Sequence, residues 1–316
     1  VSQEKKNPAD FALWKKAEAN HIMQWPSPWG QGFPGWHLEC SVMSTKYLGQ
    51  PFDIHGGGLE NQFPHHECEI AQAEAATGKQ FVNYWLHNNM VTVDGQKMGK
   101  SLGNFITLKQ VFADSPDAKH ERLSRKYDSL AARQFILTSH YRSTLDFSDE
   151  ALHAAQSGYD KLTDAVIAIR KQIKNAPKGP TAVDVESRLK TIKEKFETAM
   201  NDDFNTSIAL SVMFELAGLA NEQIAKNATN ETLAAIDNMF TKLGGDVLGI
   251  IKGQYQQDSG GNETMLDKLV SVLIEQRKTA KQNKDFATAD ALRKKIEEIG
   301  IVLEDKPGGE TGWRMK

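Results

Sequence analysis

This sequence of 316 residues is poor in several features, and each scarcity excludes a class of protein. It holds only two cysteines, which excludes a disulfide scaffold and fits a reducing, cytoplasmic compartment. No apolar run is long enough to span a bilayer, and we find no secretory signal, so no membrane partner is expected. The net charge of −3 gives no global positive field for nucleic acid, although this sum would hide a local basic face.

Side chains that can bind metals are concentrated in one stretch, FPHHECEIAQ, at positions 63–72. His65 and Glu69 are four residues apart, so a helix would place them on one face. Cys40, at the end of GWHLEC, is the obvious donor from a second element. Cysteine, histidine and glutamate together suit Zn²⁺ better than Ca²⁺ or Mg²⁺. A zinc site built from two elements is therefore one interpretation of this spacing.

A tetrahedral zinc site has a fourth position, which the sequence leaves open. His37, His55 and a residue before Val1 are the candidates. The stretch has no CxxC or HExxH signature. An acidic first helical turn, stabilised by the helix dipole, explains the same residues without any metal.

A second candidate site is the glycine-rich stretch DGQKMGKSLGNF at positions 94–105. Its two lysines, Lys97 and Lys100, could close on a polyphosphate and stabilise the charge that develops on departing pyrophosphate. Asp94-Gly95 predicts a two-residue hairpin turn just before them. The alternative is a solvated hairpin end, which is the more frequent origin of an isolated KxxK.

Two patterns divide the chain at about residue 106. Before it, a strand at PFDIH that breaks at three glycines, a helix from Pro64 to Gly78 and a strand from FVNYWLHNNMVTV predict part of a parallel α/β sheet. NPADFALWKK predicts a short helix near the start. After residue 106 the pattern is helical, with Ser148 as a helix cap and a linker at 174–181. The later helices are expected at 183–200, 206–227, 230–243, 263–283 and 286–299, with a loop at QQDSGGNET and a terminal β-turn-β finger.

Several motifs follow one another in a specific order: GWHLECS, DIHGGG, FPHHECEIAQ and KMGKSLGNF, then SHYRSTLDFS, DDFNTSIAL and KDFATADALR. In this order they resemble cysteinyl-tRNA synthetases, which are class I aminoacyl-tRNA synthetases, over essentially the whole chain. The resemblance implies an α/β part followed by an all-α part. Residues 1–106 would be the second half of a Rossmann-type catalytic domain, 107–175 a helical stem-contact region, and 183–316 a helical-bundle anticodon-binding domain with its β finger.

The family reaction joins cysteine to ATP, giving cysteinyl adenylate, and then transfers cysteine to tRNA-Cys. The resemblance implies one zinc ion that binds the substrate thiolate, with a fourth ligand, a cysteine, upstream of this sequence. The residues that match the family's sites are Cys40, His65 and Glu69 for zinc; Trp36 and His55 for the cysteine pocket; Lys97 and Lys100 for the KMSKS-like loop; Lys100, Gly56 and Gly57 for ATP; and Lys281, Phe286, Asp290, Arg293 and Trp313 for the anticodon.

The sequence also departs from the family. Gly99 stands where the lysine loop usually has serine, Glu60 where an aspartate is usual, and Phe33 where arginine is common. A HIGH-type motif is missing, so we expect a piece of a synthetase that cannot activate cysteine alone. The alternatives are a ligase that joins cysteine to an amino sugar in mycothiol synthesis, or a tRNA-binding module without catalysis. A monomer is expected.

Overall fold

The computed structural model describes residues 5–112, 120–255, 262–283, 285–305 and 311–315. Contacts divide the chain into two units, Val1–Lys252 and Gly253–Lys316. Within the described ranges, no helix is both long and apolar enough to cross a membrane.

A small antiparallel sheet begins the first unit, with β1 (Trp14–Lys16), β2 (Trp25–Ser27) and β3 (Gly30–Pro34) in the order β1-β3-β2. The helix predicted for NPADFALWKK is therefore wrong. The Asp10 carboxylate accepts hydrogen bonds from the amides of Lys6 and Asn7, which closes a turn, and the following residues pair with β3.

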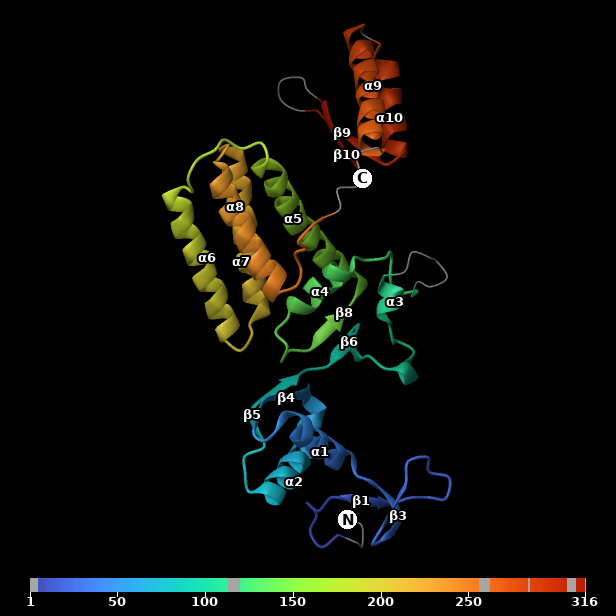
Figure 1. The fold of residues 1–316 in the computed structure, drawn as a ribbon. Coiled ribbons are helices and arrows are strands. Elements are labelled where there is room, and N and C mark those ends of the chain that lie inside the picture. Colours follow the sequence, from blue (N-terminus) through green and yellow to red (C-terminus); the bar gives the residue numbers. More distant parts are fainter. Residues whose placement is uncertain (1–4, 113–119, 256–261, 284, 306–310, 316) are drawn as a thin grey trace. The chain divides into compact units, whose positions relative to one another are not determined.

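The next elements form a β-α-β unit (Figure 1). After α1 (Trp36–Leu48) come β4 (Phe52–Gly58), α2 (Glu67–Thr77) and β5 (Val82–Asn88). Strands β4 and β5 are parallel, as the sequence predicts, and α1 packs against α2. The small core of this unit consists of Phe52, Ala73, Phe81 and Val82.

Two boundaries in this unit differ from those expected. Strand β4 continues through its glycines, because Gly56, Gly57 and Gly58 pair with residues 86–88 of β5. The α-helix begins at Glu67 and not at Pro64, because the preceding 3₁₀ turn (Leu59–Asn61) and π turn (Gln62–His66) contain an extended residue at position 63. The predicted end is confirmed, since Gly78 caps α2 in the left-handed conformation.

A three-stranded sheet follows, with β6 (Val91–Val93), β7 (Gln96–Lys97) and β8 (Leu145–Phe147) in the order β7-β6-β8. The two-residue turn predicted at Asp94-Gly95 is confirmed. Both residues have positive φ, 51° and 76°, and they connect the antiparallel strands β6 and β7. Two short elements, a 3₁₀ turn (Lys100–Leu102) and α3 (Leu108–Val111), complete this region.

Helices dominate from residue 129 onward. Helix α4 spans Ser129–Leu137. Helix α5 (Asp149–Ile173) is capped as predicted by Ser148, whose hydroxyl accepts from the Ala151 amide. After the linker come α6 (Val183–Asn201), α7 (Thr206–Ala225) and α8 (Asn230–Met239), which continues as a π-helix (Phe240–Val247).

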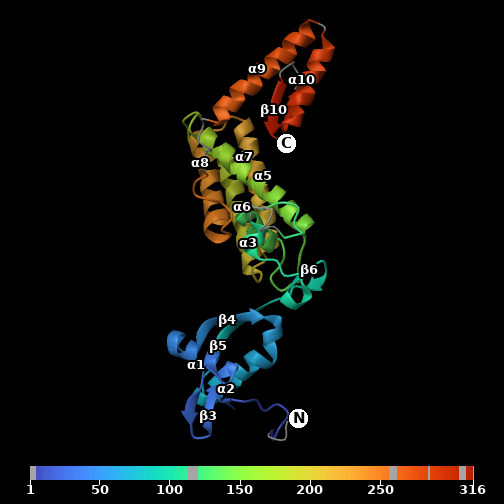
Figure 2. The ribbon, with the colours of Figure 1, turned by 90° about the vertical axis from the view of Figure 1, so that its right-hand side faces the viewer.

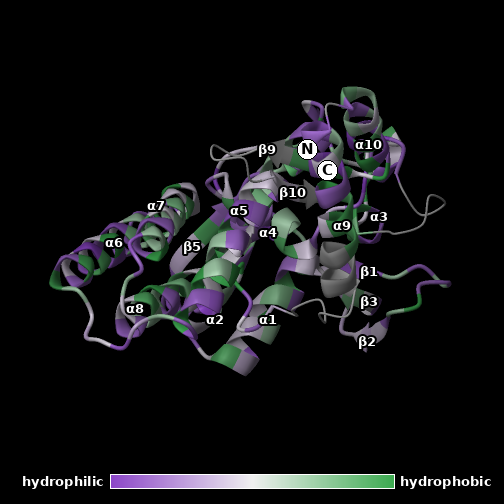
Figure 3. Ribbon diagram, turned by 90° about the horizontal axis from the view of Figure 1, so that it is seen from above, coloured by the Kyte–Doolittle hydropathy of each residue, from purple (hydrophilic) through white to green (hydrophobic). Residues whose placement is uncertain are grey.

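Helices α5, α6, α7 and α8 pack side by side in a bundle (Figures 1 and 2). Hydrophobic and hydrophilic bands alternate along α6 and α7, as expected for helices that bury one face (Figure 3). The contacts between elements place this bundle in the first unit, together with α4. A domain boundary at residue 183 stays a prediction.

The second unit contains α9 (Asn262–Gln282), α10 (Phe286–Glu298) and the antiparallel pair β9 (Ile301–Asp305) and β10 (Thr311–Met315). The two helices and the β finger confirm the sequence prediction. Residues 256–261 of the predicted loop lie outside the described residues, as does the finger's turn at 306–310. A small core of Val270, Ile296, Ile301 and Leu303 holds the unit together.

Candidate metal centre and substrate site

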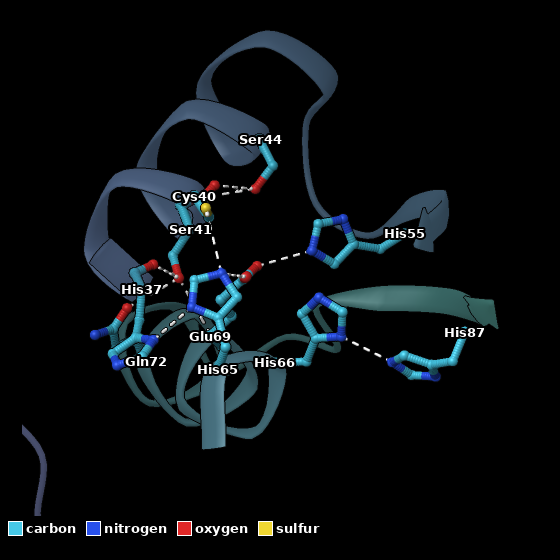
Figure 4. A network of polar contacts seen from close by, with 10 residues as sticks. All are labelled: His37, Cys40, Ser41, Ser44, His55, His65, His66, Glu69, Gln72 and His87. Atoms are coloured by element: carbon cyan, nitrogen blue, oxygen red, sulfur yellow. Dashed lines mark hydrogen bonds and ion pairs between the residues drawn. The ribbon is translucent and has the colours of Figure 1, made fainter. Parts of the chain in front are cut away.

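Three predicted metal ligands converge from two helices and the turn between them (Figure 4). The Nε2 atom of His65 lies 2.9 Å from Oε1 of Glu69 and 3.6 Å from Sγ of Cys40. All three ligand atoms lie within 4.8 Å of one another. Because α1 supplies the sulfur and α2 the carboxylate, the packing of these two helices builds the cluster.

A hydrogen bond between Ser41 of α1 and Gln72 of α2 connects the two helices next to Cys40. The Ser41 hydroxyl lies 3.0 Å from Oε1 of Gln72 and 3.4 Å from the backbone oxygen of Glu69. Ser41 is the only buried residue of α1, and it follows Cys40 directly. The thiol is thereby held against α2.

The buried carboxylate of Glu69 indicates that the cluster fits a cation. The residue is fully buried, and within the described part of the chain its Oε1 atom receives no well-aligned hydrogen bond, although His65 Nε2 lies 2.9 Å away. A buried carboxylate whose contacts are two imidazole rings is costly to keep ionised, whereas sulfur, nitrogen and oxygen ligands at this spacing suit Zn²⁺. Burial, and then the Glu69 and Glu39 carboxylates, raise the pKa of the Cys40 thiol to about 11. Such a thiol stays protonated at neutral pH unless a cation binds beside it.

The residues left open for the fourth position contact this cluster in other ways. The Nδ1 atom of His37 lies 2.7 Å from Nδ1 of His65, which orients that ring with Nε2 toward Cys40. His55 Nε2 lies 2.9 Å from Oε2 of Glu69, the other oxygen of the same carboxylate. Glu69 is therefore shared between the Cys40 side and the His55 side of the site.

A second group of histidines adjoins the first and was not predicted as a group. His55, His66 and Glu69 also bring ligand atoms within 4.8 Å of one another, and His66 Nδ1 lies 2.8 Å from Nε2 of His87. Burial lowers the pKa of His66 to about 4, so its ring is neutral. His87 is on β5, eighteen residues beyond Glu69, and no local spacing in the sequence signals it.

The predicted pocket residues surround this cluster. The Trp36 ring lies over the His65 ring with centroids 3.8 Å apart, and 57% of Trp36 is exposed, so a ligand at the cluster could reach it. Gly56 and Gly57 lie at the carboxyl end of β4, where parallel sheets usually bind ligands. A Cβ at Gly57 would lie 2.8 Å from the His66 ring, so only glycine fits there.

The lysine loop belongs to a different element, the β6–β7 hairpin and the turn after it. Lys97 and Lys100 are both exposed, and the Lys100 ammonium lies over the Phe105 ring. Asn104, which the sequence analysis overlooked, spans the loop. Its buried amide donates to the Lys97 carbonyl at 3.0 Å and accepts from the Gly99 amide at 2.9 Å. The only sequence signal for it is the GN pair after the lysines.

The predicted anticodon residues occupy α9, α10 and β10. Phe286, Asp290 and Arg293 recur at helical spacing and are exposed, with 62% of Phe286 accessible. Lys281 is exposed in the last turn of α9. Trp313 is half-buried against the small core, which indicates that packing accounts for part of its presence.

Comparisons with known families match most of the chain. A model described as "tRNA synthetases class I (C) catalytic domain" matches residues 1–157, and a "DALR domain" matches 195–252. A "Cysteinyl-tRNA ligase anticodon binding domain" matches 265–314. A cysteine–tRNA ligase of Chlorobaculum tepidum is 49% identical over 99% of this chain and 61% of its own length. A cysteine–tRNA ligase of Bacteroides fragilis is 48% identical, and the match again covers 99% of this chain and 61% of the relative's length.

The chain belongs to the cysteinyl-tRNA synthetase family. It spans about 61% of the length of the curated relatives it matches. Among solved structures, a ternary complex of Agrobacterium radiobacter K84 agnB2 LeuRS has a TM-score of 0.51 and 17% identity, covering 70% of this chain and 32% of that one. At this identity the likeness concerns the fold alone, and it agrees with the class I architecture that the sequence predicts.

The family models divide the candidate residues of this synthetase-family chain between two matches. Cys40, His65, Glu69 and the lysine loop fall within the catalytic-domain match. Lys281, Phe286, Asp290, Arg293 and Trp313 fall within the anticodon-binding match.

Replacing Asn104 with alanine is expected to loosen the lysine loop. The change removes two hydrogen bonds that join its two arms, and the Lys97 carbonyl and Gly99 amide lose their partner. We expect the amides of residues 97–103 to exchange with solvent roughly tenfold faster, as for loss of about 1.4 kcal/mol of protection. Hydrogen exchange with mass spectrometry measures this. The exposed neighbour Ser101→Ala is the control, and equal rates in both variants would contradict the role of Asn104.

Proposed function

We propose that the protein performs the ATP-dependent ligation of cysteine to tRNA-Cys. The observation that carries this proposal is the convergence of Cys40, His65 and Glu69 beside Trp36 and His55, in a chain whose family also supplies an anticodon-binding domain. Because the chain spans about 61% of its relatives, the activity is proposed for the protein as a whole.

Zinc would be held by Cys40, His65 and Glu69. When bound, Zn²⁺ supplies a thiophilic Lewis acid that favours a substrate thiolate over a hydroxyl. His37 orients the His65 ring, and Glu69 connects the metal side to His55 in the pocket wall. Rejection of serine needs no editing if this preference reaches ~10⁴-fold, because a ligand-specific site can supply that much discrimination.

The lysine loop would bind the phosphates of ATP. Lys100 and Lys97 place two positive charges on a loop whose shape Asn104 fixes, and their charge would stabilise pyrophosphate as it leaves. Gly56 and Gly57 allow the nucleotide to approach the backbone at the end of β4.

The exposed face of α10 would read the anticodon. Phe286 would stack on a base, and Asp290 and Arg293 would hydrogen-bond to base edges. Lys281 would contact a phosphate, and Trp313 would contribute from the β finger. We also propose that the protein acts as a cytoplasmic monomer, and that residues 1–106, 107–175 and 183–316 are its catalytic, stem-contact and anticodon-binding parts.

The comparisons do not favour the amino-sugar ligase. The relatives described above are cysteine–tRNA ligases, and the match over residues 265–314 is to an anticodon-binding domain, which an amino-sugar ligase does not need.

Binding of this chain to tRNA-Cys, and to the same transcript with an altered anticodon, tests the proposal. We expect a clear preference for the native anticodon at several salt concentrations, because phosphate contacts alone give salt-sensitive binding without selectivity. Equal binding of both transcripts at every salt concentration would count against anticodon reading by α10.

Asp290→Ala is expected to reduce this preference more than the total affinity. Loss of one base contact costs about 1–3 kcal/mol of discrimination, whereas phosphate contacts remain. The measurement is the ratio of the two dissociation constants, and Glu275→Ala, an exposed acidic residue of α9, is the matched control. An equal loss on both transcripts would contradict a reading role for Asp290.

A further inference from the structure

The segment between α4 and β8 contacts two distant parts of the first unit. Its backbone holds Asn89, because the Asn89 amide donates to the Tyr141 carbonyl at 2.9 Å and its side chain donates to the Arg142 carbonyl at 3.0 Å. The contact continues along β6, where the Leu145 amide donates to the Met90 carbonyl and β8 pairs in parallel with β6.

The side chains of the same segment hold the turn between α6 and α7. Asp203 accepts a hydrogen bond from the Tyr141 hydroxyl at 2.7 Å and from Nε of Arg142 at 2.5 Å. His140 Nε2 lies 3.8 Å from the same carboxylate. Three consecutive side chains therefore converge on one acidic residue more than sixty positions later in the sequence.

The backbone of this turn is strained. Asp203 and Phe204 both have positive φ, 53° and 55°, and neither is glycine. Left-handed backbone is uncommon for a bulky residue such as Phe204, whereas aspartate adopts it more readily, and the Phe204 conformation persists only where surrounding contacts overdetermine it. The paired contacts of Asp203 with Tyr141 and Arg142 are the contacts that hold the turn in this shape.

Asn89 occupies a sensitive position in the synthetase fold. It lies two residues after His87 of the histidine cluster, and β6 begins two residues later and leads through the Asp94-Gly95 turn to Lys97. Displacement of Asn89 would therefore move the end of β5 and the base of the lysine loop together.

We propose that Asp203, Tyr141 and Arg142 form a latch that couples the α6–α7 turn of the helical bundle to the β5–β6 connection. Asp203 is then a positioning residue, which acts on the lysine loop through Tyr141, Arg142 and Asn89. A bound partner that displaces the bundle would, through these contacts, also displace the end of β5 and the base of the lysine loop. The latch goes beyond the proposed reaction and does not depend on which substrate the sites bind.

Hydrogen exchange of this chain, followed by mass spectrometry, tests the latch in Asp203→Asn. Asparagine tolerates left-handed backbone, so the substitution removes the charge and leaves the turn conformation available. We expect the amides of residues 89–98 to exchange roughly tenfold faster, as for loss of a charge-assisted hydrogen bond. Tyr141→Phe, which removes one of the two donors, should give a smaller increase in the same residues.

Two further variants make the result decisive. Glu222→Gln breaks the exposed contacts of Glu222 with Arg188 and Lys226 on the same bundle, and should leave residues 89–98 unchanged. Asp203→Gly removes the carboxylate while relieving the left-handed strain, so it keeps the test valid if Asp203→Asn folds poorly. Faster exchange confined to residues 139–145 and 199–207 in these Asp203 variants would overturn the proposal, as would an equal change in Glu222→Gln.

Discussion

Replacing Glu69 with glutamine is expected to weaken Zn²⁺ binding at least about 100-fold, or ~2.7 kcal/mol. Glu69 is the only carboxylate in the cluster, and its fully buried Oε1 faces His65 Nε2 at 2.9 Å. The neutral amide of glutamine lacks the negative charge that stabilises a bound dication. It also presents either an NH₂ group, which is not a ligand, or a carbonyl oxygen, which is a weaker ligand than a carboxylate. Titration against a chromophoric zinc chelator measures the affinity.

Glu67→Gln is the matched control for this change. Glu67 lies two residues earlier in the same first turn of α2, carries the same charge and is exposed. We expect its zinc affinity to equal that of the unmodified chain. If Glu69→Gln and Glu67→Gln bind zinc equally well, the metal site as assigned here is wrong.

Phe81→Ala is expected to destabilise the β-α-β unit by about 3–5 kcal/mol, the usual cost of deleting a fully buried phenylalanine. Phe81 is wholly buried, and its ring meets the Phe52 ring edge-on with centroids 5.2 Å apart. The core around it has only four buried members, so no larger set of side chains can close the cavity. Because β4 and α2 pack on this core, zinc affinity should fall as well.

Differential scanning calorimetry measures this loss. Tyr84→Ala on the adjacent strand β5 is the control, because 68% of Tyr84 is exposed. We expect that control to change stability by less than about 0.5 kcal/mol. A loss of under about 1 kcal/mol in Phe81→Ala would show that this core does not hold the unit together.

Local signals in the sequence predicted the elements whose structure depends on near neighbours. Asp94-Gly95 fixes its turn because both residues accept positive φ, and Ser148 caps α5 through its own hydroxyl. The long amphipathic helices α6 and α7 were expected within two residues of their observed ends, because one buried face sets their period. His65 and Glu69 were paired by helical spacing alone.

Tertiary pairing decided the features that the sequence did not reveal. Strand β4 extends through three glycines because β5 lies beside it, and the residues around Trp14 pair with β3 although they resemble a short helix. His87 of β5 contacts His66 of the π turn, and Asp203 contacts Tyr141, which lies 62 positions earlier in the sequence. Contacts at such separations leave no periodicity in a single sequence.

The shared carboxylate of Glu69 also limits how this site could be redesigned or could diverge. One oxygen faces the Cys40 side, where the metal would bind, and the other reaches His55 of the proposed cysteine pocket. A substitution that alters metal preference therefore alters the pocket in the same step. Under the proposed function, a route to a different amino acid specificity must change both parts together, which makes single-step evolutionary paths out of cysteine recognition scarce.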